Sequence, residues 1–120
     1  MPTLKQNLLA ELLGTMFLVI AAIGSTILAF NVLQGNLALA VFMNGIAVAF
    51  VLFALIETFG SISGSHFNPA VTLALLASGE TPKRKAACYI IVQFAGGLLG
   101  LLLVHLMFYD TIPLLIDFSD

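Results

Sequence analysis

Asn68, Pro69 and Ala70 follow a stretch of small and polar residues, 60–67, and are the residues most suited to binding chemistry. Asparagine is a strong helix N-cap and proline is favoured at the first helical position, so the sequence predicts a helix that starts here. The amino end of a helix carries a partial positive charge. The Asn68 amide would add N–H donors at the same point, so this helix start would offer both donors and positive potential.

The backbone before Asn68 could supply acceptors. Gly64 permits the unusual dihedral angles of an irregular loop, and the carbonyl groups of Gly64, Ser65 and His66 could then face a cavity in a row. Acceptors that lead to a donor and a positive dipole suit water or a neutral hydroxyl compound, and they repel cations, including hydronium. A second interpretation stays open, in which the same helix is amphipathic and lies on a membrane surface.

The composition indicates the solvent in which these residues work. The chain has 120 residues, of which 61% are hydrophobic and 8% are charged, and its mean hydropathy is +1.14. Soluble domains are about 25% charged, and a small particle exposes much of its surface. Residues 12–56, 58–79 and 86–109 contain no Asp, Glu, Lys or Arg. We therefore expect an integral membrane protein of the all-α class.

The same composition excludes several classes of function. Four basic residues and a net charge of −2 give no footprint for nucleic acid. A single cysteine, Cys88, allows no intrachain disulfide and no thiolate metal cluster, and we expect neither a metal nor a cofactor. His66 and His105 are far apart in the sequence and lack a nearby nucleophile or carboxylate pair, so we expect no enzymatic activity.

Three apolar segments are long enough to cross a bilayer core of about 30 Å, which takes roughly 20 residues. The predicted helices cover about 8–33, 37–59 and 86–109, within a single domain, 1–120. The segment at about 60–78 is too short to cross. Irregular backbone at membrane depth is tolerated only where protein or water surrounds it, so we expect a re-entrant loop and half-helix there.

The basic residues predict the orientation of the chain. All four lie at Lys5 and in 83–85, and the expected crossings place both positions on one side of the membrane. The positive-inside rule makes that side cytoplasmic. The N-terminus is then cytoplasmic, and the C-terminal tail, with Asp110, Asp117 and Asp120, is outside.

Helix-face arithmetic, at 100° per residue, indicates which side chains meet protein. Glu11 lies on a face of the first helix that is otherwise polar or small, which favours contact with protein or a cavity. Asn44 and Val48 share a face of the second helix. Gly96 and Gly100 are four residues apart, a spacing that lets helix backbones approach closely, so we expect them to pack against another helix.

Residues 63–72, Ser-Gly-Ser-His-Phe-Asn-Pro-Ala-Val-Thr, closely resemble the first NPA loop of the aquaporin, or major intrinsic protein, family. Residues 10–15, Ala-Glu-Leu-Leu-Gly-Thr, resemble its first-helix motif, and Tyr89 with Gln93 and Gly97 resembles its third helix. The resemblance covers essentially the whole chain but half of the family's fold. Family members have two inverted repeats, whose re-entrant half-helices meet at the midplane.

The resemblance implies a role for each matched residue of the loop. Asn68 would be the donor at the midpoint of a pore. Gly64, Ser65 and His66 would line the cytoplasmic half of that pore with carbonyl groups.

The resemblance also implies which residues support the loop and which residues select the solute. Glu11 would brace the loop by accepting backbone N–H bonds, and Gln93 would add support. The family's constriction takes an aromatic residue some 20 positions before the asparagine; that position is Val48 here, with Asn44 one turn further out. A small apolar residue there implies a wide filter that admits solutes such as glycerol.

We therefore expect half of a passive channel for water or small neutral solutes such as glycerol. One repeat cannot enclose a pore, so the expected partner is a complementary, separately encoded repeat of opposite orientation, or an oligomer, within the lipid bilayer.

Two other functions remain open. The first is a small proton-coupled antiporter that works as an antiparallel dimer through Glu11, because burial raises the pKa of a carboxyl group. The second is a non-conducting subunit that packs against a full-length channel through the glycine face at 93–104 and modulates it.

Overall fold

The computed structural model describes residues 1–110. Two aspartates of the predicted outer tail, Asp117 and Asp120, lie outside the described residues. The helices of the described range are α1 (Leu4–Ile27), the π-helical turn η1 (Leu28–Val32), α2 (Leu37–Ser63), α3 (Pro69–Ala77) and α4 (Lys83–Met107).

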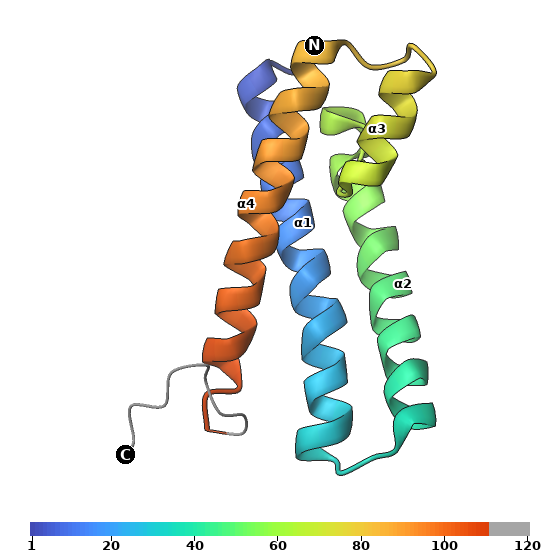
Figure 1. Cartoon of the computed structure of the whole chain (residues 1–120), viewed down its shortest axis with the longest axis vertical. Coiled ribbons are helices and arrows are strands. Elements are labelled where there is room, and N and C mark those ends of the chain that lie inside the picture. Colours follow the sequence, from blue (N-terminus) through green and yellow to red (C-terminus); the bar gives the residue numbers. More distant parts are fainter. Residues whose placement is uncertain (111–120) are drawn as a thin grey trace.

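The predicted all-α membrane fold is confirmed. Within residues 1–110 there is no strand, and the helices long and apolar enough to cross a membrane are Leu4–Val32, Leu37–Ser63 and Lys83–Met107. The long helices run side by side, and α3 is a short helix beside them (Figure 1). These elements are consistent with the single repeat and half-helix that the family resemblance implies.

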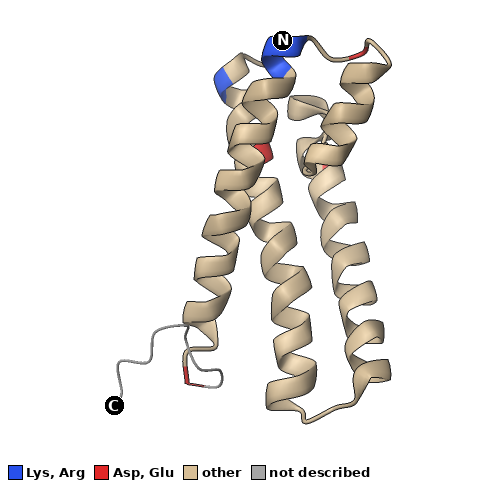
Figure 2. Ribbon diagram, in the orientation of Figure 1, with Lys and Arg blue, Asp and Glu red and all other residues tan. Residues whose placement is uncertain are grey.

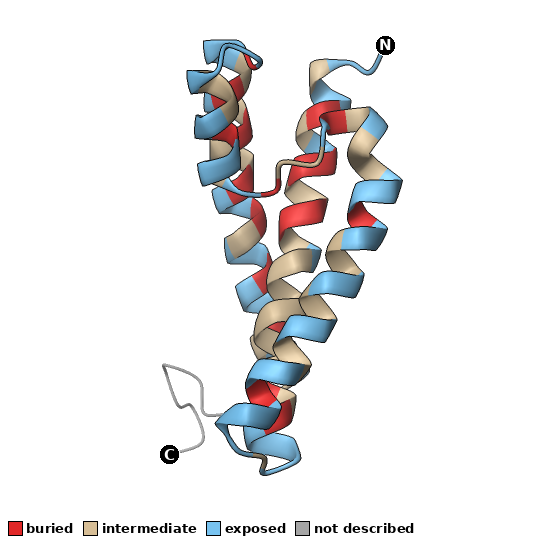
Figure 3. Cartoon of the chain, turned by 90° about the vertical axis from the view of Figure 1, so that its right-hand side faces the viewer, coloured by how far each residue is buried: buried red, intermediate tan, exposed pale blue. Residues whose placement is uncertain are grey.

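Helix α1 is the centre of the fold. It packs along both α4 and α2, whereas α3 packs against α4. Figure 1 shows α2 rising to the end of the molecule that holds the N-terminus. The chain then turns back toward the middle of the molecule through residues 64–68, and α3 returns to the same end, so the chain enters and leaves on one side (Figures 1 and 3).

The helix ends follow from local capping. Helix α1 begins at Leu4 because Thr3 and Gln6 form a capping box, in which each side chain bonds the other's backbone N–H. Helix α2 runs to Ser63, four residues beyond the predicted end, and stops where Gly64 takes a left-handed φ of 85°.

Close contact between α1 and α4 depends on two glycines. A Cβ atom at Gly100 would lie 2.6 Å from the Met16 carbonyl oxygen, and one at Gly96 would collide with the Leu12 carbonyl. Any larger residue would push the helices apart. Gly96 and Gly100 therefore lie where the backbones of α1 and α4 meet.

The surface divides into charged ends and an apolar belt. Figure 2 shows the basic residues, which belong to the beginnings of α1 and α4, at the end that holds the N-terminus. Buried residues lie on the sides where helices face each other, and the outer sides are exposed (Figure 3). Large apolar side chains cover these outer sides, among them Phe50, Phe53 and Phe94. An apolar outer surface of this kind is suited to lipid or to a partner helix.

Candidate functional site

The loop between α2 and α3 has a strained backbone. Gly64, Ser65 and Phe67 have φ angles of 85°, 52° and 52°. A positive φ is easy for glycine but costs about 1–3 kcal/mol for other residues, and it persists only where surrounding structure holds it. The shape of this loop therefore requires support from outside the loop.

Glu11 of α1 supplies this support. Its side chain is fully buried (0% exposed), and its carboxylate accepts hydrogen bonds from two loop backbone N–H groups and two side chains. The donors are His66 N (3.1 Å), Phe67 N (2.8 Å), Ser63 Oγ (2.7 Å) and Gln93 Nε2 (2.8 Å). A buried carboxylate is costly unless several donors satisfy it, as they do here.

The same hydrogen bonds determine where the loop carbonyl groups point. In a trans peptide the N–H of one residue and the C=O of the residue before it point in opposite directions. Because His66 N and Phe67 N point at Glu11, the carbonyls of Ser65 and His66 point away from it. Ser65 N donates to Ser63 Oγ (3.1 Å), which likewise turns the Gly64 carbonyl outward.

These three carbonyl oxygens are free acceptors. Within residues 1–110 no recorded hydrogen bond ends on the carbonyl of Gly64, Ser65 or His66. Gly64 is exposed and Ser65 and His66 are half-buried, and a backbone carbonyl is a strong acceptor that takes a partner from water where the protein offers none. A run of three unpaired carbonyls is therefore suited to bind water or a hydroxyl group.

Asn68 adds a donor at the end of this run. It caps α3, since its Oδ1 accepts a hydrogen bond from Ala70 N at 2.8 Å, and Pro69 is the first helical residue. Asn68 is exposed, and its Nδ2 has no partner among residues 1–110. The cap thus fixes the amide with its NH2 group free, next to the positive end of the α3 dipole.

A second set of side chains holds the ends of the loop. Tyr89 donates from its hydroxyl to the Ser63 carbonyl (2.7 Å), and the Asn7 amide donates to the Ile62 carbonyl. Gln93 Nε2 also donates to Thr72 Oγ1 at 3.0 Å. These contacts tie the end of α2 and the start of α3 to α1 and α4.

Several of these residues were missed by sequence reasoning, namely Asn7, Ser63 and Thr72. The contact between Phe67 and Gly14 was missed as well: the Phe67 ring fills the space that a side chain at Gly14 would occupy. Their partners are far apart in the sequence, and the available signal was limited to polar residues within apolar segments.

The two predicted filter residues are placed differently. Asn44 donates from Nδ2 to the Ala22 carbonyl (2.7 Å) and to Thr26 Oγ1 (3.4 Å), so its amide joins α2 to α1. Val48, one turn further along α2, is half-buried, and among residues 1–110 its side chain takes part in no hydrogen bond. The structure does not bring either residue together with the loop.

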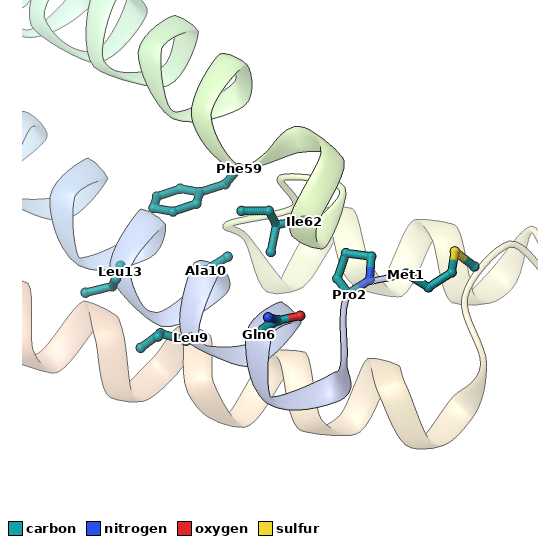
Figure 4. A pocket seen from close by; sticks show the side chains of 8 residues that line it. All are labelled: Met1, Pro2, Gln6, Leu9, Ala10, Leu13, Phe59 and Ile62. Atoms are coloured by element: carbon teal, nitrogen blue, oxygen red, sulfur yellow. The ribbon is translucent and has the colours of Figure 1, made fainter.

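Two cavities near the basic end differ in character. One, of about 480 Å³, lies between α1 and α2; Figure 4 shows its apolar side chains, among them Leu13, Phe59 and Ile62. The other, of about 440 Å³, is more polar and is lined in part by Gly64 and His66. We regard the second as the candidate vestibule, because it adjoins the loop with its free acceptors.

Fold and site together define an all-helical membrane repeat with a strained re-entrant loop. Hydrogen bonds from α1 and α4 hold this loop, and its free acceptors and donor point away from them. Comparison with known proteins agrees: the family model for major intrinsic proteins matches residues 1–116. The chain therefore belongs to the major intrinsic protein family.

Named relatives show how much of a family member the chain represents. It is 45% identical over 111 residues to "Aquaglyceroporin AqpS" of Rhizobium meliloti, which covers 92% of this chain and 47% of that protein. It is 39% identical over 105 residues to "Aquaporin NIP1-2" of Arabidopsis thaliana (86% and 34%). It is also 39% identical over 101 residues to "Aquaporin Z" of Rhodopseudomonas palustris (82% and 40%). The chain thus spans about half the length of these relatives or less.

Proposed function

We propose that this chain supplies one half of a passive channel for water or small neutral solutes such as glycerol. A second repeat of inverted orientation closes the pore. The observation that supports this most is the row of unpaired carbonyls at Gly64, Ser65 and His66, which ends at the free amide of Asn68. The row has no net charge, so it replaces the hydrogen bonds of a neutral solute without binding a cation strongly.

The need for a partner follows from the enclosure of the site. Asn68 and Gly64 are exposed, so this chain provides one wall of a passage. The named relatives are roughly two to three times as long as the matched segment, which is compatible with a second repeat for the opposite wall. Val48 stays our proposed filter residue. Asn44, whose amide is bonded to α1, serves the filter by holding α2 in place.

Stopped-flow measurements on vesicles test the proposal. The chain is co-reconstituted with the part of AqpS that it does not match. We expect water and glycerol permeability above that of empty vesicles for the pair. Permeability equal to that of empty vesicles would contradict the proposal.

A matched pair of substitutions sharpens this test. Asn68→Asp replaces the free donor by a carboxylate, and we expect loss of glycerol flux. Asn36→Asp is the control, because Asn36 also caps a helix, accepting from Leu39 N at 2.9 Å, but it lies in the turn before α2. Equal glycerol flux through both variants would show that Asn68 does not line the passage.

The contacts of Glu11 favour this proposal over an antiporter. Residues 1–110 satisfy its carboxylate with four donors, so a proton carried there would have to break the hydrogen bonds that shape the loop. In the channel proposal, glycerol flux is independent of a proton gradient. Flux that follows an imposed gradient and disappears in Glu11→Gln would support the antiporter instead.

The proposed orientation places the basic end, with the N-terminus, in the cytoplasm. Glu80 lies in the turn between α3 and α4 and is exposed, whereas Tyr109 lies beyond the other end of α4 and is also exposed. On a Cys88→Ala background, a membrane-impermeant maleimide added to whole cells should label Tyr109→Cys and spare Glu80→Cys. The reverse pattern would invert the proposed topology.

A further inference from the structure

The side chains of His66 and Thr72 are joined at the edge of the candidate vestibule. His66 Nδ1 lies 2.9 Å from Thr72 Oγ1, and Thr72 is fully buried (0% exposed). Either atom could carry the shared proton, because a neutral imidazole nitrogen and a hydroxyl can each donate or accept. The neighbours of Thr72 decide between the two arrangements.

The carboxylate of Glu11 sets the first hydrogen-bond direction in this chain of contacts. A carboxylate only accepts, so Gln93 must turn its NH2 group toward Glu11 Oε1, at 2.8 Å. The same nitrogen lies 3.0 Å from Thr72 Oγ1, and its second hydrogen is directed there. This orientation leaves Gln93 Oε1 buried and without a partner among residues 1–110. The hydrogen bond to Glu11 therefore sets the orientation of the Gln93 amide, even though the amide oxygen is left without a donor.

The orientation of the Gln93 amide determines where the Thr72 hydroxyl hydrogen points, and that hydrogen determines the tautomer of the His66 ring. Thr72 Oγ1 accepts from Gln93, and within the described range its recorded contacts offer no acceptor for its own hydrogen except His66 Nδ1. Nδ1 is then an acceptor, and a neutral His66 carries its hydrogen on Nε2. The ring is also held in place by an edge-on contact with Tyr89, with centroids 4.9 Å apart.

We propose that Thr72 is a positioning residue that fixes His66 as the Nε2–H tautomer and thereby places an N–H donor at the vestibule. His66 lines this cavity together with Gly64. Its Nε2 has no recorded partner among residues 1–110 and is not among the buried unpaired atoms. His66 Nε2 lies 3.5 Å from the position that a Cβ atom of Gly64 would occupy, so the donor is near Gly64 and available to a bound molecule.

The tautomer has a consequence for selectivity, which rests on the proposed channel function. A hydroxyl group can accept from His66 Nε2 and donate to a loop carbonyl at the same time. A small polyol carries several hydroxyl groups, so one can make this paired contact while another binds a neighbouring loop carbonyl. The substrate class favoured at this position is therefore a small polyol.

Nitrogen-15 NMR on the histidine-labelled chain in lipid nanodiscs tests the tautomer directly. The sequence has two histidines, and His105 is an internal reference. Its Nδ1 lies 2.8 Å from the Leu101 carbonyl oxygen, which only accepts, so His105 is the Nδ1–H tautomer. At a pH well above the ordinary histidine pKa of about 6.5, the spectrum should show one ring of each tautomer. His105→Asn should remove the Nδ1–H signals and so assign them.

Two variants of Thr72 separate positioning from packing. Thr72→Ser keeps the hydroxyl and should keep the His66 spectrum. Thr72→Val keeps the shape and removes the hydroxyl, and it should convert a large fraction of His66 to the Nδ1–H form. A wild-type His66 that carries its proton on Nδ1, or a Thr72→Val spectrum identical to wild type, would overturn the proposal.

Flux measurements then test the consequence for selectivity. In the co-reconstituted vesicles, Thr72→Val should reduce glycerol permeability relative to water by about fivefold, the factor that one neutral hydrogen bond is worth. Thr72→Ser should leave this ratio unchanged. An unchanged ratio in Thr72→Val would refute the selectivity role. A wild-type pair that conducts nothing would refute the proposed channel, whereas the NMR result on the tautomer would be unaffected.

Discussion

The two ends of the helix bundle are held together by different kinds of contact. At the basic end the large fully buried side chains are polar and hydrogen-bonded across helices: Glu11, Thr72, Tyr89 and Gln93, each at most 1% exposed, beside the small Ala86. At the opposite end the fully buried side chains are small or apolar, namely Ala29 and Val104, both 0% exposed. There the recorded side-chain hydrogen bonds between helices, within residues 1–110, come from Asn44.

The difference follows from what each end must hold. The opposite end joins regular helices, whose backbone groups are already paired, so close packing is sufficient. The basic end holds a loop with left-handed residues and unpaired carbonyls, and residues 64–67 lack the regular backbone hydrogen bonds of a helix. Hydrogen bonds from polar side chains hold this loop instead. Substitutions at the basic end should therefore cost more than substitutions at the opposite end.

The largest effect is expected for Glu11→Ala. His66 N and Phe67 N would lose their recorded acceptor, and each unsatisfied buried donor costs about 1–3 kcal/mol, so we expect a loss of roughly 2–6 kcal/mol. The free energy of unfolding is measured by SDS titration in mixed micelles. Glu57→Ala is the control, because Glu57 is exposed and has no recorded hydrogen bond within residues 1–110. Equal losses in the two variants would show that the four hydrogen bonds of Glu11 do not stabilise the basic end.

The next effect is expected for Gly96→Ala. The added methyl would collide with the Leu12 carbonyl, and overpacking of this kind costs about 1–3 kcal/mol. The matched control is Gly45→Ala in α2, where a Cβ would meet nothing within 4 Å. That control should be neutral or stabilising by up to about 1 kcal/mol, because alanine favours helix over glycine. The same unfolding titration measures both variants, and a harmless Gly96→Ala would disprove the close backbone contact.

A smaller loss is expected for Tyr89→Phe, about 1 kcal/mol, because one hydrogen bond to the Ser63 carbonyl disappears. Thermal unfolding in detergent, followed by circular dichroism, measures the change. Tyr109→Phe serves as the control, since Tyr109 is exposed. A Tyr89→Phe variant as stable as the control would show that the hydroxyl does not hold the end of α2.

The smallest effect is expected at the opposite end, for Asn44→Ala. A hydrogen bond between membrane helices contributes about 0.6 kcal/mol on average, and the contact with Ala22 and Thr26 is of this kind. Asn31→Ala, at an exposed position of η1, is the control. A loss at Asn44 as large as that of Glu11→Ala would remove the expected difference between the ends.

Much of the fold could be predicted from the sequence, because its signals are local. Charge-free apolar segments define the long helices, and an asparagine followed by proline defines the start of α3. The helix ends were less well predicted, since Thr3 extends α1 through a capping box and Gly64 sets the end of α2. The family was identified from residues 63–72, and the match over residues 1–116 confirms it.

The contacts within the site could not be predicted in the same way. Glu11 and Gln93 were singled out by family resemblance, but their joint contact with each other and with Thr72 depends on the relative rotation of three helices. The same holds for Asn44, which was predicted beside the filter, whereas its amide donates to the Ala22 carbonyl of α1. Local patterns determine helices, whereas these pairings depend on the packing register between helices.

The long separation between Glu11 and Gln93 has a consequence for how the protein is made. The two residues are 82 positions apart, and a ribosome that adds about 5–20 residues per second would take roughly 4–16 seconds to reach the second after the first. During that interval the carboxylate of the newly inserted first helix lacks its last donor. The cost of burying that carboxylate is therefore fully offset only after α4 has been synthesised and has packed against α1.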